Sequence, residues 1–431
     1  MKIGGIIAEY NPFHKGHSYQ IEEFKKKSSL SHIVVAMSGN FVQRGGPALI
    51  DKYARTQMAL HNGVDLVIEI PSIFAGQTAE IFARGGLLSL NSLGCVDSFC
   101  FGSEDGDIDK LSKLADFMFN ESTWIQDRSR LLMKEGLSYS RARQEAISNA
   151  FKDFNVDSLL GGSNNILALE YLKEARRLKT SMEPMTIKRE GSSYNSLDIY
   201  DEIPSASAIR QVILNAQSDK TPCENKELDQ PVKEVLRQAM DNTSLELLDN
   251  IVSQGIDLMG EESFFQEISY IVAREGHSIK EYFEVNDGLE NSIQSQVAKS
   301  ISLEDSLGKL SNKSHTRSKV RRALYNILLG ISWSDVDQAK LMYRLPYIRV
   351  LGMNDRGRDI LRLTKEKSDL DIITSPAKAK ASGKYTQDSL YRLLLNTDLR
   401  TSGIYYQKYY YKSPKMLARG QADFFDTRYN L

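Results

Sequence analysis

The sequence predicts an α/β protein with a doubly wound parallel sheet, followed by a mainly helical carboxyl-terminal domain. In the first half of the chain, short runs rich in β-branched and aromatic residues alternate with longer segments of helical periodicity. The short runs are apolar on both faces, which is typical of strands that helices cover on both sides. Beyond residue 230, most periodic segments have a helical period.

The predicted strands and helices alternate in a regular order. Strands are expected at residues 2–10, 32–39, 64–71 and 96–104, with the sequences KIGGIIAEY, HIVVAMSG, VDLVIEIP and VDSFCFGSE. Helices are expected between them at 18–28, 51–63 and 75–94, and then over much of residues 107–180. Because strands separated by such helices form βαβ units, the strands are expected to lie parallel.

Length and composition fit a globular protein of two or three domains. The chain has 431 residues, 41% of them hydrophobic, and its three cysteines do not suffice for a disulfide framework. No stretch approaches the roughly 18 uninterrupted apolar residues of a membrane span, so we expect a cytoplasmic protein without a membrane partner. A polar, proline-containing stretch suggests a first domain at 1–217, a linker at 218–230 and a mainly helical region at 231–431.

The charge is distributed unevenly along the chain. The formal net charge is −1, yet residues 301–431 carry 24 Lys and Arg against 13 Asp and Glu. Two segments within this part, 306–334 and 399–422, contain basic residues and no acidic ones. A basic region on an acidic body favours a polyanionic partner, although a solvated Lys-rich surface explains the charge alone equally well.

The segment AEYNPFHKGH at residues 8–17 links the first predicted strand to the first predicted helix. It follows the carboxyl end of a strand in a parallel sheet, which is where such folds bind ligands. His14 and His17 are three residues apart, so both imidazoles face the same way beside free backbone N–H groups. Gly16 lets a base or a phosphate approach the backbone. The pattern indicates an anion site, although two such His could also cap a helix or form a partial metal site.

This H-x-G-H element resembles the signature of the class I nucleotidyltransferase superfamily, in which the imidazoles stabilise ATP phosphates while the α-phosphorus is attacked. A second segment, SASAIR at residues 205–210, is similar to the S-S-T-x-I-R stretch that closes over the triphosphate in cofactor adenylyltransferases. Ala206 and Ser207 depart from the usual Ser and Thr, and a plain Ser N-cap explains this segment as well.

Further motifs extend over nearly the whole chain, at residues 7–19, 37–45, 51–55, 64–71, 101–104, 164–172, 316–329 and 347–354. Together they resemble the bacterial tRNA(Met) cytidine acetate ligase family. The resemblance implies a ligase that activates acetate with ATP to acetyl-adenylate and pyrophosphate. It then implies acetylation of N4 of the wobble cytidine of elongator tRNA(Met).

The resemblance also implies the site residues, with His14 and His17 as the catalytic pair. The implied ATP-binding residues are Ile7, Ala8, Glu9, Tyr10, Asn11, Pro12, Phe13, His14, Lys15, Gly16, His17, Ser18, Tyr19, Gln20, Gly102, Asn164 and Arg189. Glycine at 102 would permit close approach of a ligand, but it could also be a turn residue. Asn164 could be a helix N-cap, and Arg189 a surface ion pair.

The remaining expectations concern metal and RNA. The other His residues lack Cys or carboxylate neighbours at metal-ligand spacing, so no protein-held metal is expected, and Mg²⁺ is expected to arrive with ATP. The loop at 43–45 is a candidate for phosphate or acetate binding and equally an ordinary loop. The candidate tRNA-binding residues lie in or beside the acid-free segments: Arg317, Lys319, Arg321, Arg322, Lys408 and Lys412.

Two other functions remain open from the residues alone. A cofactor adenylyltransferase that acts on a small phosphorylated metabolite would use the same H-x-G-H element, but it would not need the basic end. A non-catalytic RNA-binding protein would use the basic end, but it would not need both imidazoles. The identity of the acyl group and of the tRNA rests on the resemblance, and the oligomeric state stays open.

Overall fold

A computed structural model of the chain describes residues 1–120, 123–137, 139–151, 156–189, 205–218, 228–256, 258–409 and 425–426. The strands are β1 (Ile3–Ala8), β2 (His32–Ser38), β3 (Leu66–Ile70), β4 (Ser98–Ser103), β5 (Glu183–Lys188), β6 (Tyr347–Met353), β7 (Asp371–Ile373) and β8 (Phe425–Asp426). The helices up to the predicted linker are α1 (Lys15–Ser28), α2 (Lys52–His61), α3 (Ser72–Ala75), α4 (Ala79–Ser92), α5 (Ile108–Phe119), α6 (Thr123–Lys134), α7 (Tyr139–Ala150), α8 (Asp157–Gly161), α9 (Ser163–Leu178) and α10 (Ala206–Ser218). Those beyond it are α11 (Gln230–Ala239), α12 (Asn242–Ser253), η1 (Glu261–Phe264), α13 (Phe265–Glu275), η2 (Gly276–Glu281), α14 (Leu289–Val297), α15 (Leu303–Leu310), α16 (Arg317–Leu329), α17 (Trp333–Lys340), α18 (Asp355–Lys367), α19 (Pro376–Lys380), α20 (Gly383–Gln387) and α21 (Ser389–Tyr409).

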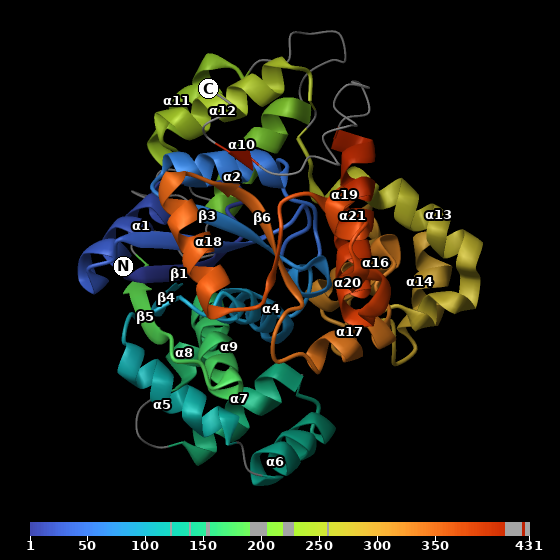
Figure 1. Cartoon of the computed structure of the whole chain (residues 1–431). Helices are drawn as coiled ribbons and strands as arrows, with labels where there is room; N and C mark the ends of the chain where they lie inside the picture. The colour runs from blue at the N-terminus through green and yellow to red at the C-terminus, as the bar shows by residue number, and fades with distance from the viewer. Residues whose placement is uncertain are drawn as a thin grey trace.

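The strands form one sheet in the order β5-β4-β1-β2-β3-β6-β7, with β8 beside β6 (Figure 1). From β5 to β3 all neighbours are parallel, as the strand–helix alternation predicts. The doubly wound α/β fold is therefore confirmed. The sequence patterns did not identify β5 and β6 as strands, and β6 runs antiparallel to β3.

Helices bury both faces of the sheet because alternate strand residues face opposite sides. On β2, Val34 and Ala36 belong to one core, whereas Ile33, Val35 and Met37 belong to the other. The first core includes Leu87, Leu88 and Leu90 of α4, and the second includes Ile21 and Phe24 of α1. This double burial is the physical reason for the continuous apolar runs in the sequence.

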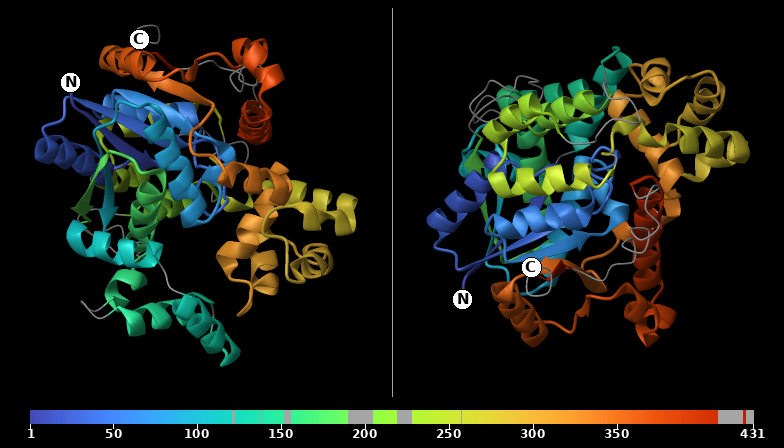
Figure 2. Two further views of the ribbon diagram at one scale, coloured as in Figure 1. Left: turned by 60° about the horizontal axis from the view of Figure 1, so that its bottom comes forward. Right: turned by 90° about the horizontal axis from the view of Figure 1, so that it is seen from above.

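The carboxyl-terminal region is mainly helical, as predicted, but it also completes the sheet. All seven residues of β6 are buried, and β6 pairs with β3. Figures 1 and 2 show α13, α14 and α16 as a group at one side of the sheet, apart from α5 to α7. Most of the predicted linker, residues 219–227, lies outside the described residues. Within the described part, no helix combines the length and apolar character of a membrane span.

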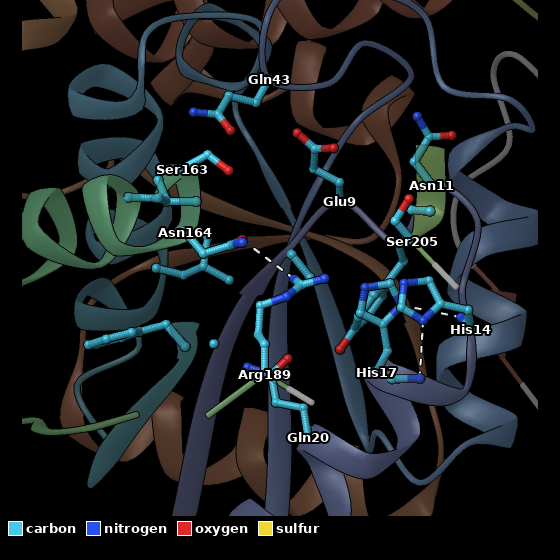
Figure 3. Close-up of a pocket in the computed structure, with 18 of the residues that line it drawn as sticks. Glu9, Asn11, His14, His17, Gln20, Gln43, Ser163, Asn164, Arg189 and Ser205 are labelled. Atoms are coloured by element: carbon cyan, nitrogen blue, oxygen red, sulfur yellow. Dashed lines mark hydrogen bonds between the residues drawn. The ribbon is translucent and has the colours of Figure 1, made fainter. Parts of the chain in front are cut away.

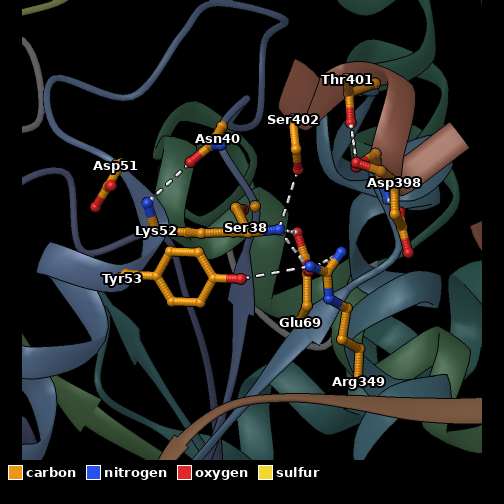
Figure 4. A network of polar contacts seen from close by, with 12 residues as sticks. Ser38, Asn40, Asp51, Lys52, Tyr53, Glu69, Arg349, Asp398, Thr401 and Ser402 are labelled. Carbon is orange, nitrogen blue, oxygen red and sulfur yellow. Dashed lines mark hydrogen bonds and ion pairs between the residues drawn. The ribbon is translucent and has the colours of Figure 1, made fainter. Parts of the chain in front are cut away.

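A buried ionic network joins β6 and α21 to the first part of the chain (Figure 4). Glu69 of β3 accepts hydrogen bonds from the Lys52 ammonium at 2.7 and 2.8 Å, and the Arg349 guanidinium lies 3.3 Å from the same carboxylate. The Lys52 ammonium also donates to the Ser402 hydroxyl of α21 at 3.1 Å. The charged side chains of this ion triad, Lys52, Glu69 and Arg349, are at most 1% exposed, so each depends on the others for compensation.

The first prediction concerns this network. Arg349→Met leaves Glu69 with one cation instead of two inside the protein, so we expect the free energy of unfolding to fall by about 3–5 kcal/mol. Arg362→Met is the matched control, because Arg362 is 72% exposed and pairs with Asp359 at the surface. It should change stability by less than about 0.5 kcal/mol. Denaturant unfolding of both variants measures the difference, and equal effects would contradict a structural role for the network.

Candidate active site

A pocket lies at the carboxyl ends of β1, β4 and β5, next to the beginnings of α1, α9 and α10 (Figure 3). Most of the residues predicted from the H-x-G-H region line it: Ile7, Ala8, Glu9, Tyr10, Asn11, His14, Gly16, His17, Tyr19 and Gln20, with Gly102, Asn164 and Arg189 from elsewhere in the chain. Four predicted residues, Pro12, Phe13, Lys15 and Ser18, do not line the pocket. Of these, Phe13 is fully buried in the core, and the Lys15 ammonium donates to the carbonyl of Arg237.

The imidazoles of His14 and His17 stack at the start of α1, with ring centroids 3.8 Å apart. His14 is the N-cap, and its Nδ1 accepts a hydrogen bond from the Gly16 backbone N–H at 3.1 Å. Nδ1 of His17 accepts from the His14 backbone N–H at 3.2 Å. Because Nδ1 is the acceptor in both rings, each neutral ring carries its proton on Nε2. The helix cap, one of the alternatives that the spacing left open, is therefore confirmed, and the anion site stays a prediction.

The surroundings keep both imidazoles neutral. Burial, with the nearby guanidinium groups of Arg189 and Arg210, lowers the pKa of His14 to about 3. Burial, the neighbouring His14 and Arg189 also hold the pKa of His17 well below its usual value. The pair therefore offers two neutral N–H donors, and the positive charge of the site comes from arginines.

The second predicted motif lies beside the first in the pocket (Figure 3). Ser205 caps α10 by accepting a hydrogen bond from the Ala208 backbone N–H at 3.1 Å, so the plain N-cap interpretation of this segment is confirmed. Ser205, Ser207 and Arg210 all line the pocket. The Arg210 guanidinium donates to the carbonyl of Asn11 at 2.7 Å and to the Ser207 hydroxyl at 3.1 Å. The two motifs are thus joined directly, and the starts of α1 and α10 face one cavity.

Asn164 is held in place by a carboxylate that the sequence analysis did not single out. Glu104, just after β4, accepts hydrogen bonds from the backbone N–H and the side-chain amide of Asn164 at 3.0 and 2.8 Å, and from the Asn165 N–H at 2.7 Å. Glu104 therefore caps α9, and Asn164 is not itself the N-cap. Gly162 is required here, because a Cβ would lie 2.7 Å from a Glu104 oxygen.

Arg189 extends from the end of β5 across Gly102. A Cβ at residue 102 would lie 3.3 Å from Cγ of Arg189, so the glycine makes room for this side chain. The Arg189 guanidinium donates to the side-chain oxygen of Asn164 at 3.4 Å. It is thus tied to the α9 end of the pocket.

The rest of the pocket lining includes a set of apolar side chains and a polar loop. Phe82, Phe101, Leu167 and Tyr171 supply an apolar wall suited to a flat ring, and the sequence analysis missed them because they resemble ordinary core residues. Gln43 and Arg44 also line the pocket, so the loop at 43–45 belongs to the site. Its conformation is unusual, since Arg44 and Gly45 both have positive φ, at 73° and 95°.

Five of the six basic candidates for RNA contact are ion-paired in the structure. Arg322 makes two hydrogen bonds to Glu284 at 2.6 and 2.7 Å, and both side chains are nearly buried. The remaining pairs are Arg317–Glu304, Lys319–Asp287, Arg321–Glu261 and Lys408–Glu267. These five basic residues of the acid-free segments are therefore paired with acids from other parts of the chain. Lys412 lies outside the described residues.

The described residues contain no group of three or more His, Cys, Asp or Glu side chains that could hold a metal ion.

Comparisons with known proteins agree over nearly the full length. A protein-family model described as HIGH Nucleotidyl Transferase matches residues 1–419. The tRNA(Met) cytidine acetate ligase of Thermoanaerobacter pseudethanolicus is 38% identical over 380 residues, which are 88% of this chain and 90% of that protein. The ligase of the same name from Caldanaerobacter subterraneus subsp. tengcongensis is 37% identical over 425 residues, covering 99% and 98%.

Solved structures give the same result. Thermotoga maritima TmcAL bound with alpha-thio ATP superimposes with a TM-score of 0.85 at 27% identity, covering 99% of this chain and 100% of that one. The apo form of the same protein superimposes with a TM-score of 0.88 at the same identity and coverage.

The second prediction follows from the lowered pKa of His14. Because its folded-state pKa lies below the usual 6.5, the unfolded chain takes up the proton first as pH falls, so stability decreases from about pH 6.5 toward pH 3. His14→Asn keeps a good N-cap but does not titrate, so its melting temperature should fall less between pH 7.5 and pH 5.5 than that of the wild type. His61→Asn, at an exposed position, is the control and should keep the wild-type decrease. An equal decrease in all three proteins would contradict the assignment.

Proposed function

The chain belongs to the HIGH nucleotidyl transferase family, and from this premise we propose that it is an ATP-dependent tRNA(Met) cytidine acetate ligase. The observation that carries the proposal is the pair of neutral imidazoles at the start of α1, next to the start of α10 in one pocket. That arrangement offers N–H donors and arginines to a polyphosphate. The apolar wall of Phe82, Phe101, Leu167 and Tyr171 would receive the adenine.

We propose that the first step is the activation of acetate. A carboxylate oxygen of acetate attacks the α-phosphorus of ATP, the bond to pyrophosphate breaks, and acetyl-adenylate forms. The Nε2–H groups of His14 and His17 would stabilise the charge that develops on the phosphate oxygens, and Arg189 and Arg210 would hold the phosphates. Because no metal cluster is found among the described residues, Mg²⁺ would enter with the triphosphate, held by phosphate oxygens and water.

In the second step, the acetyl group passes to N4 of the wobble cytidine of elongator tRNA(Met). A base in an anticodon loop is already unpaired, so bringing its amine into the pocket costs less than extruding a base from a helix. We infer that the tRNA lies along the carboxyl-terminal region, residues 231–431, and that the protein works in the cytoplasm.

The exposure of the acid partner distinguishes the stronger from the weaker candidates for tRNA contact. The acid partners of Arg317 and Lys319 are 68% and 71% exposed, so these pairs can exchange for phosphate at little cost. The partner of Arg322 is only 10% exposed, and breaking that pair would strand a carboxylate. We therefore keep Arg317 and Lys319 as the better candidates and Arg322 as the weakest.

The third prediction tests the role of the imidazoles. His14→Ala or His17→Ala should lower acetate-dependent ATP–pyrophosphate exchange by about 100-fold or more, because each removes a donor to the developing charge. The variants should keep a cooperative unfolding transition. Near-normal exchange in both would contradict the catalytic assignment.

The fourth prediction tests the overall reaction. Labelled acetate should enter tRNA only when ATP is present, with AMP and pyrophosphate as the other products and the label at one anticodon-loop cytidine. Transfer of AMP to a small phosphorylated metabolite, with no label in RNA, would instead establish a cofactor adenylyltransferase. RNA binding without ATP turnover would indicate a non-catalytic RNA-binding protein.

A further inference from the structure

Glu9 places a carboxylate in a pocket that otherwise suits anions. It follows β1 directly, lines the pocket and remains partly exposed to it. Both proposed small substrates, ATP and acetate, are anions, so an ionised carboxylate would repel either of them. The chemistry of the site therefore calls for a different partner, one that donates a hydrogen bond or a proton.

The position of Glu9 is fixed from both of its ends. The buried Arg55 guanidinium donates to the backbone carbonyl of Glu9 at 2.6 Å, which holds the main chain. The carboxylate lies close enough to the backbone N–H of Gln43, in the loop after β2, for that N–H to lower the pKa of Glu9. Figure 3 shows Glu9 near Gln43 and away from His17 and Gln20. The carboxylate thus faces the pocket on a side different from the phosphate-stabilising imidazoles.

The charges around Glu9 allow it to exchange a proton. Burial raises the pKa of the carboxyl group, while Arg210, Arg44 and Arg55 oppose that shift. The hydroxyl of Tyr171 also lies close to Glu9. Burial and the charge of Glu9 both raise the pKa of Tyr171. A carboxylate with a raised pKa is a better proton acceptor near neutral pH than an ordinary one.

We propose that Glu9 is the general base of the acyl-transfer step and receives the proton of the cytidine amine. The lone pair of N4 attacks the carbonyl carbon of acetyl-adenylate, the C–N bond forms, and the bond from that carbon to the phosphate oxygen breaks to release AMP. One N4 proton moves to the Glu9 carboxylate and is then lost to solvent. A carboxylate is also a suitable acceptor for the N4–H donor of cytosine, so Glu9 favours cytosine over bases with a carbonyl at that position.

This inference rests on the proposed function, so the test separates the two. Wild-type protein, ATP and acetate are incubated either with tRNA or with hydroxylamine, a stronger nucleophile that captures acetyl-adenylate as acetohydroxamate. Glu9→Gln should lower acetylation of tRNA by about 100-fold or more. The factor by which Glu9→Gln lowers hydroxamate formation should be at least about tenfold smaller than the factor for tRNA acetylation. The reason is that attack by hydroxylamine depends less on a general base.

Glu104→Gln is the matched control. Glu104 is the other carboxylate beside the pocket, but it acts by holding Asn164 and the start of α9. Its substitution should lower both reactions by the same factor. If Glu9→Gln folds poorly, Glu9→Asp replaces it, since the shorter carboxylate should give the same selective loss at smaller magnitude.

Two results would overturn the role of Glu9. One is an equal loss of both reactions in the Glu9 variants, which would mean that Glu9 serves ATP binding or adenylate formation. The other is normal acetylation of tRNA by Glu9→Gln. Absence of hydroxamate and of pyrophosphate exchange in the wild-type protein would instead contradict the proposed function itself.

Discussion

The buried carboxylate of Glu69 is the interaction on which the rest of the structure depends. It compensates Lys52 from the start of α2 and Arg349 from β6, two residues that are nearly 300 positions apart in sequence. Its space is also reserved, because a Cβ on Gly39 would lie 2.5 Å from a Glu69 oxygen. Since charges inside a protein are tolerated only when they are compensated, loss of the carboxyl-terminal strand from the sheet would leave Glu69 with one cation in place of two. The predicted boundary near residues 218–230 therefore marks a change in the sequence pattern. In the structure, β6 from the second part pairs with β3 from the first, so both parts share one sheet.

A second buried cation, Arg55, connects the loops beside the pocket to one another. The Arg55 guanidinium donates to the carbonyls of Glu9 after β1, of Ser38 and Gly39 at the end of β2, and of Ile50 before α2. The loops that carry Glu9 and Gln43 are thereby fixed to each other through one planar group. The loop at 43–45 also contacts α16. Arg321 donates a hydrogen bond to the carbonyl of Arg44, and Gly45 packs against Arg322. The loop that forms one wall of the pocket therefore contacts the basic helix that the sequence analysis associated with RNA.

Much of the fold could be predicted from the sequence because the apolar runs of β1 to β4 are local signals. β5 begins with the exposed residues Glu183 and Pro184, and β6 carries Arg349 at its centre, so neither shows a clean strand pattern. The H-x-G-H and SASAIR segments were identifiable because each has a local motif, and the structure brings them together. The role of Glu104 and the neutralisation of the basic segments were not predictable, since both depend on contacts between distant residues. An acid-free stretch of sequence says nothing about acids such as Glu284 that pack against it from another segment.

The place of β6 in the sheet has a consequence during synthesis on the ribosome. Strands β1 to β5 emerge early, yet the edge of β3 stays without its neighbour until residues 347–353 have been made. At the roughly 5–20 residues per second of bacterial translation, that edge waits for about 15–60 s. An unpaired strand edge that is apolar except for Glu69 is a template for wrong pairing with other chains. The nascent chain therefore needs shielding by chaperones, or by the helices made in between, for most of the time that its translation takes.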